Sequence, residues 1–170
     1  MNGSTARCEL RRAFGRFATG VTIATARAPG GQPVGVTVNS FTSVSLDPPL
    51  ILWSLARKAS SLPVFLAGSH FAVNILSEEQ QSLSERFATP VENRFEGIDW
   101  SPGMAGVPLL SGCIATFECL SAKHIEAGDH TLFLGSVQGY RCRPGTPLLF
   151  FASRYGALQQ PHEAMAHEAA

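Results

Sequence analysis

The sequence predicts a mainly β protein whose strands close, or nearly close, into one barrel. Three observations predict this fold class. Short runs rich in Val, Ile, Thr and Phe recur along the 170 residues, Gly and Pro separate these runs, and strands do not alternate with helices in the βαβ manner. This length suits a single domain, and a hydrophobic fraction of 45% is ample for a core. We expect the domain to span residues 1–158 and the tail over 159–170 to be weakly ordered.

The first part of the chain predicts a helix followed by strands. Leu10, Phe14 and Phe17 recur at helical spacing, while most of the nearby arginines fall elsewhere, which indicates an amphipathic helix over residues 6–18. Further on, short runs are rich in β-branched residues or alternate between apolar and polar positions. These runs predict strands over residues 21–26, 34–39 and 50–55.

The second part predicts two short helices among further strands. Ser60 and Ser61 are possible caps of a helix that has Pro63 in its first turn. Ser77 and Gln80 form the capping-box pattern of another helix. Apolar runs predict strands over residues 71–76, 109–120, 131–140 and 148–151, and the Gly and Pro content of residues 89–108 predicts a loop.

Charge and hydropathy exclude two classes of partner. Thirteen basic and thirteen acidic residues balance, and no basic stripe is present, so a nucleic-acid binder is not expected. No stretch approaches the roughly 18 apolar residues that span a bilayer, so no membrane association is expected. The N-terminus lacks the apolar segment of a signal peptide, and we therefore expect a cytoplasmic protein.

The four cysteines do not predict a metal site, because none forms a C-x-x-C pair or stands at zinc-finger spacing. Cys113 and Cys119 would share one face of a strand with Ala115 and Phe117. We interpret them as small buried hydrophobic residues, and a redox disulfide remains the alternative.

Nucleotide-binding glycine motifs are absent from the sequence. It contains no G-x-G-x-x-G and no G-x-x-x-x-G-K-[ST]. A Rossmann site and a P-loop are therefore not expected, and a nucleotide here would bind without the usual glycine fingerprint.

The first candidate binding segment is residues 37–45, in which six of the nine side chains carry a hydroxyl or an amide. Such groups donate and accept hydrogen bonds without net charge, and together with backbone amides they suit a phosphate and the polar edge of a flavin ring. Phe41 would pack on that ring or fill the core. The alternative is an ordinary Ser/Thr-rich strand end.

Two further segments in the middle of the chain are candidate sites. The run from Arg57 to Ser61 precedes a predicted helix, and Lys58 would add a positive charge for a phosphate; the alternative is a capped surface helix. His130 follows Gly128 and Asp129, and it could position a nicotinamide or shuttle a proton; the alternative is a structural histidine.

Near the end of the predicted domain, Arg154 could meet a phosphate and Tyr155 could stack on a ring; the alternative is a strand edge. At the end of the capped helix, Phe87 is expected in the core, and Arg86 is a candidate to face a flavin.

Taken together, these segments resemble one family, the short-chain flavin reductases that serve as the small component of two-component flavin monooxygenases. The resemblance runs in order from about residue 10 to 158, and the order and spacing of its segments make it specific. The matching segments are Phe17–Thr22, Gly35–Phe41, Ser43–Leu50, Phe71–Leu76, Phe87–Ala88, Gly128–His130 and Arg154–Gly156.

The resemblance implies a split β-barrel of the FMN-binding type that pairs as a homodimer. It also implies which residues contact the cofactors. The flavin contacts are Thr37, Val38, Asn39, Ser40, Phe41, Ser43, Val44, Ser54, Lys58, Ala59, Ser60, Arg86 and Phe87, and the nicotinamide contacts are His130, Ser153, Arg154, Tyr155 and Gly156. His130 carries the catalytic assignment, because it matches the histidine of the family's G-D-H motif.

The implied activity is hydride transfer from NADH or NADPH to FMN or FAD, with the reduced flavin passed to a partner oxygenase. One alternative is a flavin-binding protein of the same barrel that holds FMN tightly as an electron carrier. Another is a ligand-binding or structural β-barrel without catalysis. The sequence does not choose FMN over FAD or NADH over NADPH, and it does not name the partner oxygenase.

Overall fold

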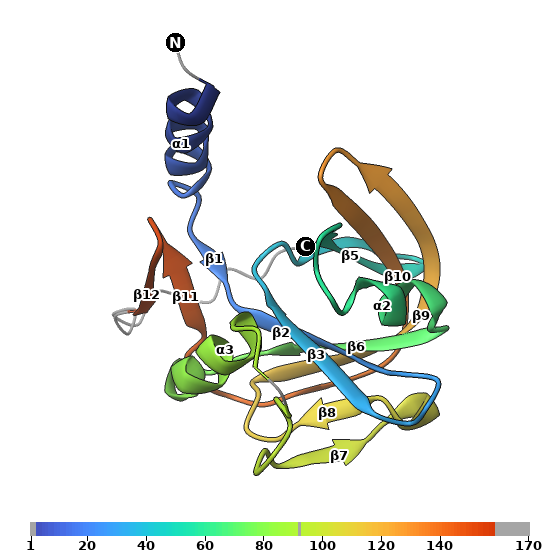
Figure 1. The fold of residues 1–170 in the computed structure, drawn as a ribbon. Coiled ribbons are helices and arrows are strands. Elements are labelled where there is room, and N and C mark those ends of the chain that lie inside the picture. The colour runs from blue at the N-terminus through green and yellow to red at the C-terminus, as the bar shows by residue number, and fades with distance from the viewer. Residues whose placement is uncertain (1–2, 92, 159–170) are drawn as a thin grey trace.

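A computed structural model of the chain describes residues 3–91 and 93–158, and the described residues are mainly β, as predicted (Figure 1). Their strands form a seven-stranded sheet of order β3-β2-β6-β9-β10-β5-β4, a three-stranded sheet of order β1-β11-β12 and the pair β7-β8. All the strand pairs are antiparallel. The predicted tail over residues 159–170 lies outside the described residues.

The elements follow the predicted order closely in the first half of the chain. The helices are α1 (Gly3–Phe14), α2 (Leu62–Ala67) and α3 (Gln81–Ala88), and single 3₁₀ turns lie at Glu78–Gln80 and Met104–Gly106. The strands are β1 (Thr19–Gly20), β2 (Thr22–Arg27), β3 (Pro33–Val38), β4 (Thr42–Leu46), β5 (Pro49–Ala56), β6 (His70–Ile75), β7 (Trp100–Pro102), β8 (Pro108–Leu110), β9 (Ala115–Ala127), β10 (His130–Cys142), β11 (Leu148–Phe151) and β12 (Arg154–Ala157).

The main core lies against one face of the curved seven-stranded sheet. Alternate side chains of β5, among them Ile51, Trp53 and Leu55, are buried there. The Trp53 ring stacks on Phe133 of β10 at a centroid distance of 4.6 Å and meets Phe65 of α2 edge-on. Stacked and edge-on aromatic pairs add to the stabilisation that burial provides.

The seven-stranded sheet is curved, but among the described residues no backbone hydrogen bonds join its two edge strands into a closed barrel. Its order leaves β3 and β4 as edge strands. Consecutive in the chain, they are linked by residues 39–41. The mainly β fold class is confirmed, and among the described residues backbone pairing does not close the predicted barrel.

The predicted long strand over residues 109–120 is wrong, because the chain turns inside it. Gly112 has φ +77°, which L side chains rarely adopt, and Ser111 donates its backbone N–H to Asp99 O at 3.0 Å. This turn separates β8 from β9. The apolar pattern did not indicate this turn, because the segments on both sides of it are extended strands.

Helix α1 begins and ends earlier than predicted, and its apolar face is not buried in the chain. Figure 1 shows it projecting away from the sheets. Leu10, Phe14 and Phe17 are 54%, 70% and 78% exposed. The predicted amphipathic pattern is present, but no described part of the same chain covers it.

Two of the four cysteines match the prediction of small buried residues, and none forms a disulfide. Cys113 and Cys119 are buried, whereas Cys8 and Cys142 are exposed. Burial raises the pKa of the Cys113 thiol to about 11 and that of Cys119 to about 12. Both buried thiols therefore stay protonated and unreactive at neutral pH.

Gly35 allows α3 to pack closely on β3. A Cβ at this position would lie 2.5 Å from Cε1 of the buried Phe87 ring and 3.2 Å from Cζ of Phe95. We expect Gly35→Ala to lower the free energy of unfolding by about 1–3 kcal/mol, because the fully buried ring has little room to move. Urea denaturation measures this loss. Gly20→Ala is the matched control, since no atom lies within 4 Å of its Cβ position.

Candidate functional site

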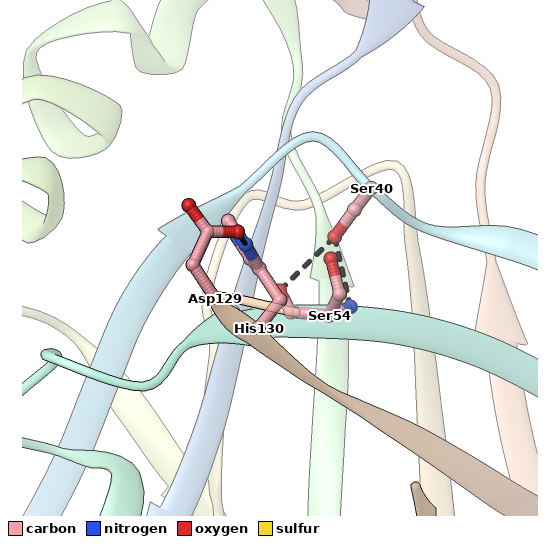
Figure 2. Close-up of polar contacts among 4 residues, drawn as sticks. All are labelled: Ser40, Ser54, Asp129 and His130. Carbon is pink, nitrogen blue, oxygen red and sulfur yellow. Dashed lines mark hydrogen bonds and ion pairs between the residues drawn. The ribbon is translucent and has the colours of Figure 1, made fainter. Parts of the chain in front are cut away.

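Several of the candidate residues meet where β5 ends and β10 begins. In the antiparallel register, His130 pairs with Ala56 and Leu132 pairs with Ser54. Because side chains alternate along a strand, His130 and Ser54 belong to the same face of the sheet. Figure 2 shows Ser54, His130, Asp129 and Ser40 gathered at this place. Residues separated by up to 90 positions in sequence thus form one polar cluster.

Ser40 fixes the loop between β3 and β4 against β5. Its Oγ accepts a hydrogen bond from the Ser54 backbone N–H at 2.9 Å and donates one to the Ser54 carbonyl at 3.1 Å (Figure 2). Asn39 and Ser40 are both exposed on this loop. The loop is therefore held in place by its serine while it still presents polar groups to solvent.

Asp129 orients His130. The carboxylate Oδ1 lies 2.7 Å from the imidazole Nδ1, so this nitrogen carries the proton and Nε2 remains available for a ligand. The hydrogen bond to His130 lowers the pKa of Asp129, and the charge of the imidazole adds to that effect. The carboxylate stays ionised at neutral pH and fixes both the ring orientation and the tautomer.

The predicted phosphate-binding turn lies beside this pair. The Arg57 backbone N–H donates to Asp129 O at 2.9 Å, and the Arg57 side chain lies 3.5 Å from Glu126. Lys58 and Ser60 are exposed, and Ala59 is half-buried. The turn is thereby attached to the start of β10, with the Lys58 ammonium free to meet an anion.

Other predicted flavin residues are engaged inside the protein. Thr37 donates its hydroxyl to Ser84 O at 2.7 Å, and Val38 lies in the core. Phe41 stacks on Phe117 at a centroid distance of 5.7 Å. These three side chains support the strand end, so backbone groups and exposed neighbours would make the contacts to a ligand.

Ser43 and Val44 lie on the edge strand β4 and are exposed. The pairing with β5 shifts register between Ser43 and Ser45, so Val44 forms an irregularity in the ladder. Bulges of this kind redirect side chains at the rims of sheets.

The structure places Arg86 and Phe87 away from the cluster around His130. Arg86 Nη2 donates to Glu96 O at 2.6 Å and to Asn93 O at 3.2 Å, which ties α3 to the following loop. Phe87 is fully buried and meets Phe95 edge-on. The expected core position of Phe87 is confirmed, and a flavin contact for either residue stays a prediction.

The segment from Ser153 to Gly156 belongs to a different sheet. It forms the turn and second strand of the β11–β12 hairpin, which Figure 1 shows on the other side of the molecule from the β9–β10 hairpin. Tyr155 contacts Ser84 Oγ through its hydroxyl at 2.9 Å and packs edge-on against Phe150. Arg154 is exposed. The chain thus does not bring the predicted nicotinamide residues together, because His130 lies at the start of β10 and residues 153–156 lie in the other sheet.

The turn of this hairpin is strained, because Ala152 has φ 48° and Ser153 has φ 64°. Left-handed backbone costs roughly 1–2 kcal/mol for a residue with a side chain, whereas Gly adopts it freely. We expect Ser153→Gly to raise the free energy of unfolding by about 0.5–1 kcal/mol after the larger entropy of Gly in the unfolded chain is subtracted. Thermal denaturation tests this. Ser101→Gly, in strand β7, is expected to destabilise, and a loss of stability in both variants would contradict the strain argument.

Sequence reasoning missed a cavity that described residues line. It has a volume of about 800 Å³ and lies between β3, the start of α2 and the loop after α3. Ser60 and Ser61 line it together with Arg94 and Phe95. No single motif marks it, because three segments far apart in the sequence build its walls.

A family model and a curated relative match nearly the whole described chain. Residues 14–159 match the model of a flavin reductase like domain. The chain is 48% identical over 151 residues to the FMN reductase (NADH) SmoA of Agrobacterium fabrum, and the match covers 89% of this chain and 86% of that protein.

A second relative is longer than this chain. The chain is 49% identical over 132 residues to the stachydrine N-demethylase reductase subunit Stc3 of Rhizobium meliloti, which covers 78% of this chain and 57% of that protein. Among solved structures, the Streptomyces globisporus NADH:FAD oxidoreductase SgcE6, in complex with NAD and FAD fragments, matches with a TM-score of 0.89. It is 36% identical, and the match covers 96% of this chain and 99% of that one.

Proposed function

The chain belongs to the flavin reductase-like domain family, and from this premise we propose that it reduces FMN or FAD with NADH or NADPH. The observation that carries the proposal is the cluster of Ser40, Ser54, Asp129 and His130, which lies at the strand ends (Figure 2). The relatives named as NADH-dependent flavin reductases support the same activity.

The donor set fits a flavin. Asn39 and Ser40 are exposed, uncharged and carried on an anchored loop. Such groups can bond to the polar edge of an isoalloxazine ring and stabilise negative charge that develops there. Lys58 and Ser60 are exposed on the adjacent turn and would hold the phosphate. A bound flavin would accept the hydride of the nicotinamide, and this redox chemistry belongs to the cofactors.

The protein's part in the reaction is to align the two rings. Holding two reactants close together in an aligned geometry removes a large part of the barrier to their reaction. His130, held by Asp129, would bind the nicotinamide through Nε2. We propose Ser153, Arg154, Tyr155 and Gly156 as further nicotinamide contacts.

We propose that the working form is a homodimer. Large apolar side chains are exposed on α1, and Leu46 on the edge strand β4 is 93% exposed. A monomer rarely leaves such groups in water, and a second copy would cover them. Light scattering at micromolar concentration tests this, and a monomer mass there would reject it.

We also propose that the reduced flavin passes to a flavin-dependent oxygenase and that the protein works in the cytoplasm, where nicotinamide cofactors are abundant. The relative Stc3 is itself named as a reductase subunit, which supports a partner of this kind. Within residues 3–91 and 93–158, no helix combines the length and apolar character that crossing a membrane requires.

A steady-state assay tests the proposed activity directly. NADH and NADPH oxidation is measured without flavin and with added FMN, FAD or riboflavin. We expect turnover only when flavin is present, with many cycles per protein molecule. Tightly bound FMN and no turnover of free flavin would favour an electron carrier, and an absence of flavin-dependent oxidation would remove the enzyme proposal.

A further inference from the structure

Another cavity lies far from the polar cluster around His130. Its walls come from the β7–β8 pair, the turn that joins β8 to β9, and the last residues of β10, and its volume is about 230 Å³. Figure 1 shows β7 and β8 at the opposite end of the molecule from the β9–β10 turn. We propose that this cavity binds a small oxyanion, that is, the phosphate or carboxylate group of a small molecule. The inference does not rest on the proposed function, because the described residues that line the cavity include none of the candidate flavin or nicotinamide contacts.

Arg143 brings to this cavity a guanidinium that is already held in place. Its Nε donates to Cys113 O at 2.9 Å, and its Nη2 donates to Gly112 O. These bonds use two of the five N–H donors of the guanidinium, so three remain for a ligand. A side chain that is fixed before binding loses less conformational entropy when the ligand arrives.

Arg141 supplies a second guanidinium from the same face of the ladder. It pairs with Thr116 of β9, and the Arg143 backbone N–H continues the pairing by donating to Ile114 O at 2.8 Å. Because side chains alternate along a strand, residues two apart share a face, so both arginines belong to the face of Thr116. All three residues line the cavity. Arg141 is exposed, so its long side chain can reach a ligand at the cavity mouth.

The cavity wall carries positive charge without a matching carboxylate. The structure shows two ion pairs among residues 3–91 and 93–158, and neither includes Arg141 or Arg143. Glu118 lies two residues beyond Thr116 on β9, but it does not line the cavity, and its carboxylate accepts the Met104 backbone N–H at 2.6 Å. Two guanidinium groups without a carboxylate partner favour an anion, and their planar, paired donors match the oxygens of a phosphate or carboxylate.

The other walls limit the size and character of the ligand. Ser101, Ser111 and Thr116 add hydroxyl groups, and Leu109 and Leu110 add apolar surface. The volume lies below the roughly 300–1,000 Å³ that is usual for drug-sized ligands. The cavity therefore suits one oxyanion group with a short apolar body and is too small for a dinucleotide.

Isothermal titration calorimetry on the full-length protein tests the proposal. Inorganic phosphate and benzoate are the two probes, in a phosphate-free buffer at constant ionic strength. We expect at least one of them to bind in a saturable way at millimolar concentration. Phosphate binding alone assigns a phosphate ligand, and benzoate binding alone assigns a carboxylate with an apolar body. If neither probe binds, the proposal is overturned.

Arg141→Gln locates the bound anion. It should weaken the affinity for the probe by at least about tenfold, the usual effect of losing a charge-assisted hydrogen bond. Arg141→Lys keeps the charge without the paired donors and should weaken it less. Arg16→Gln removes an exposed guanidinium that does not line the cavity, so it is the matched control and should stay within about twofold of the unmodified protein. Arg143 is less suitable for the test, because its bonds also hold the turn before β9.

Lys58→Gln separates this cavity from the proposed flavin site, whose phosphate turn is the other candidate place for an anion. We expect the affinity for the probe to stay within about twofold in this variant. Loss of binding in Lys58→Gln together with full binding in Arg141→Gln would place the anion at the flavin turn and overturn the proposal. Equal weakening in Arg16→Gln and Arg141→Gln would show a general effect of net charge and would overturn it as well.

Discussion

Trp53→Ala is expected to lower the free energy of unfolding by about 3–5 kcal/mol, the usual loss when a large buried aromatic side chain is truncated. The ring is fully buried and stacks on Phe133, and the rings of Phe65 and Phe71 meet it edge-on at 5.0 and 5.6 Å. These three neighbours come from β10, α2 and β6, so the cavity left behind would open between three elements. For a domain whose total stability is about 5–15 kcal/mol, this loss leaves little margin.

Urea denaturation followed by circular dichroism measures this effect. Trp53→Phe keeps an aromatic ring and should lose less than half as much as the alanine variant. Trp100→Ala is the matched control, because Trp100 is only partly buried and packs against a smaller core cluster that includes Phe87 and Leu110. A loss below about 1 kcal/mol for Trp53→Ala would show that the core repacks around the gap.

His130→Ala is expected to raise the KM for NADH or NADPH by about tenfold or more, or to lower turnover by a similar factor, while flavin affinity stays nearly unchanged. This loss corresponds to roughly 1.4 kcal/mol, a value typical of one hydrogen bond to a ligand. The reason is geometric, because Asp129 leaves the His130 Nε2 free. Steady-state kinetics and a flavin titration on the same preparations measure both quantities.

Asp129→Asn separates orientation from contact. The amide can still bond to the ring, but it can present its NH₂ to Nδ1 and favour the other tautomer. We expect Asp129→Asn to raise the KM for NADH or NADPH, as His130→Ala does, but by a smaller factor. If His130→Ala leaves KM and turnover unchanged for both NADH and NADPH, His130 does not bind the nicotinamide. The result for Asp129→Asn would not alter that conclusion.

The sequence predicted those elements whose signals are local. The capping box of Ser77 and Gln80 is confirmed, with both of its hydrogen bonds present. The position of Pro63 in the first turn of α2 is also confirmed. Period-two alternation placed β3 within one residue of its observed bounds. In each case the interactions that determine the local structure lie within a few residues of one another in the sequence.

Features that depend on distant segments could not be predicted from one sequence. The bonds from Ser40 to the Ser54 backbone arise only because β4 folds back on β5. The sequence made Arg86 a candidate to face a flavin. In the structure its guanidinium donates hydrogen bonds to the carbonyls of Asn93 and Glu96 in the following loop. The sequence offered a strand at Arg154 to Ala157 only as an alternative interpretation, because these residues do not alternate clearly between apolar and polar. The segment forms strand β12 because it pairs with β11.

The order of the large sheet has a consequence for how the chain folds. Hairpins such as β2–β3, β4–β5 and β9–β10 join neighbours in sequence and can form early. The pairing of β5 with β10 joins residues such as Ala56 and His130, so it requires the closure of a long intervening loop. Topologies rich in such distant pairings fold in milliseconds to seconds rather than microseconds. We therefore expect the β5–β10 seam, which assembles the polar cluster, to form late, so that binding competence appears only with the final kinetic phase.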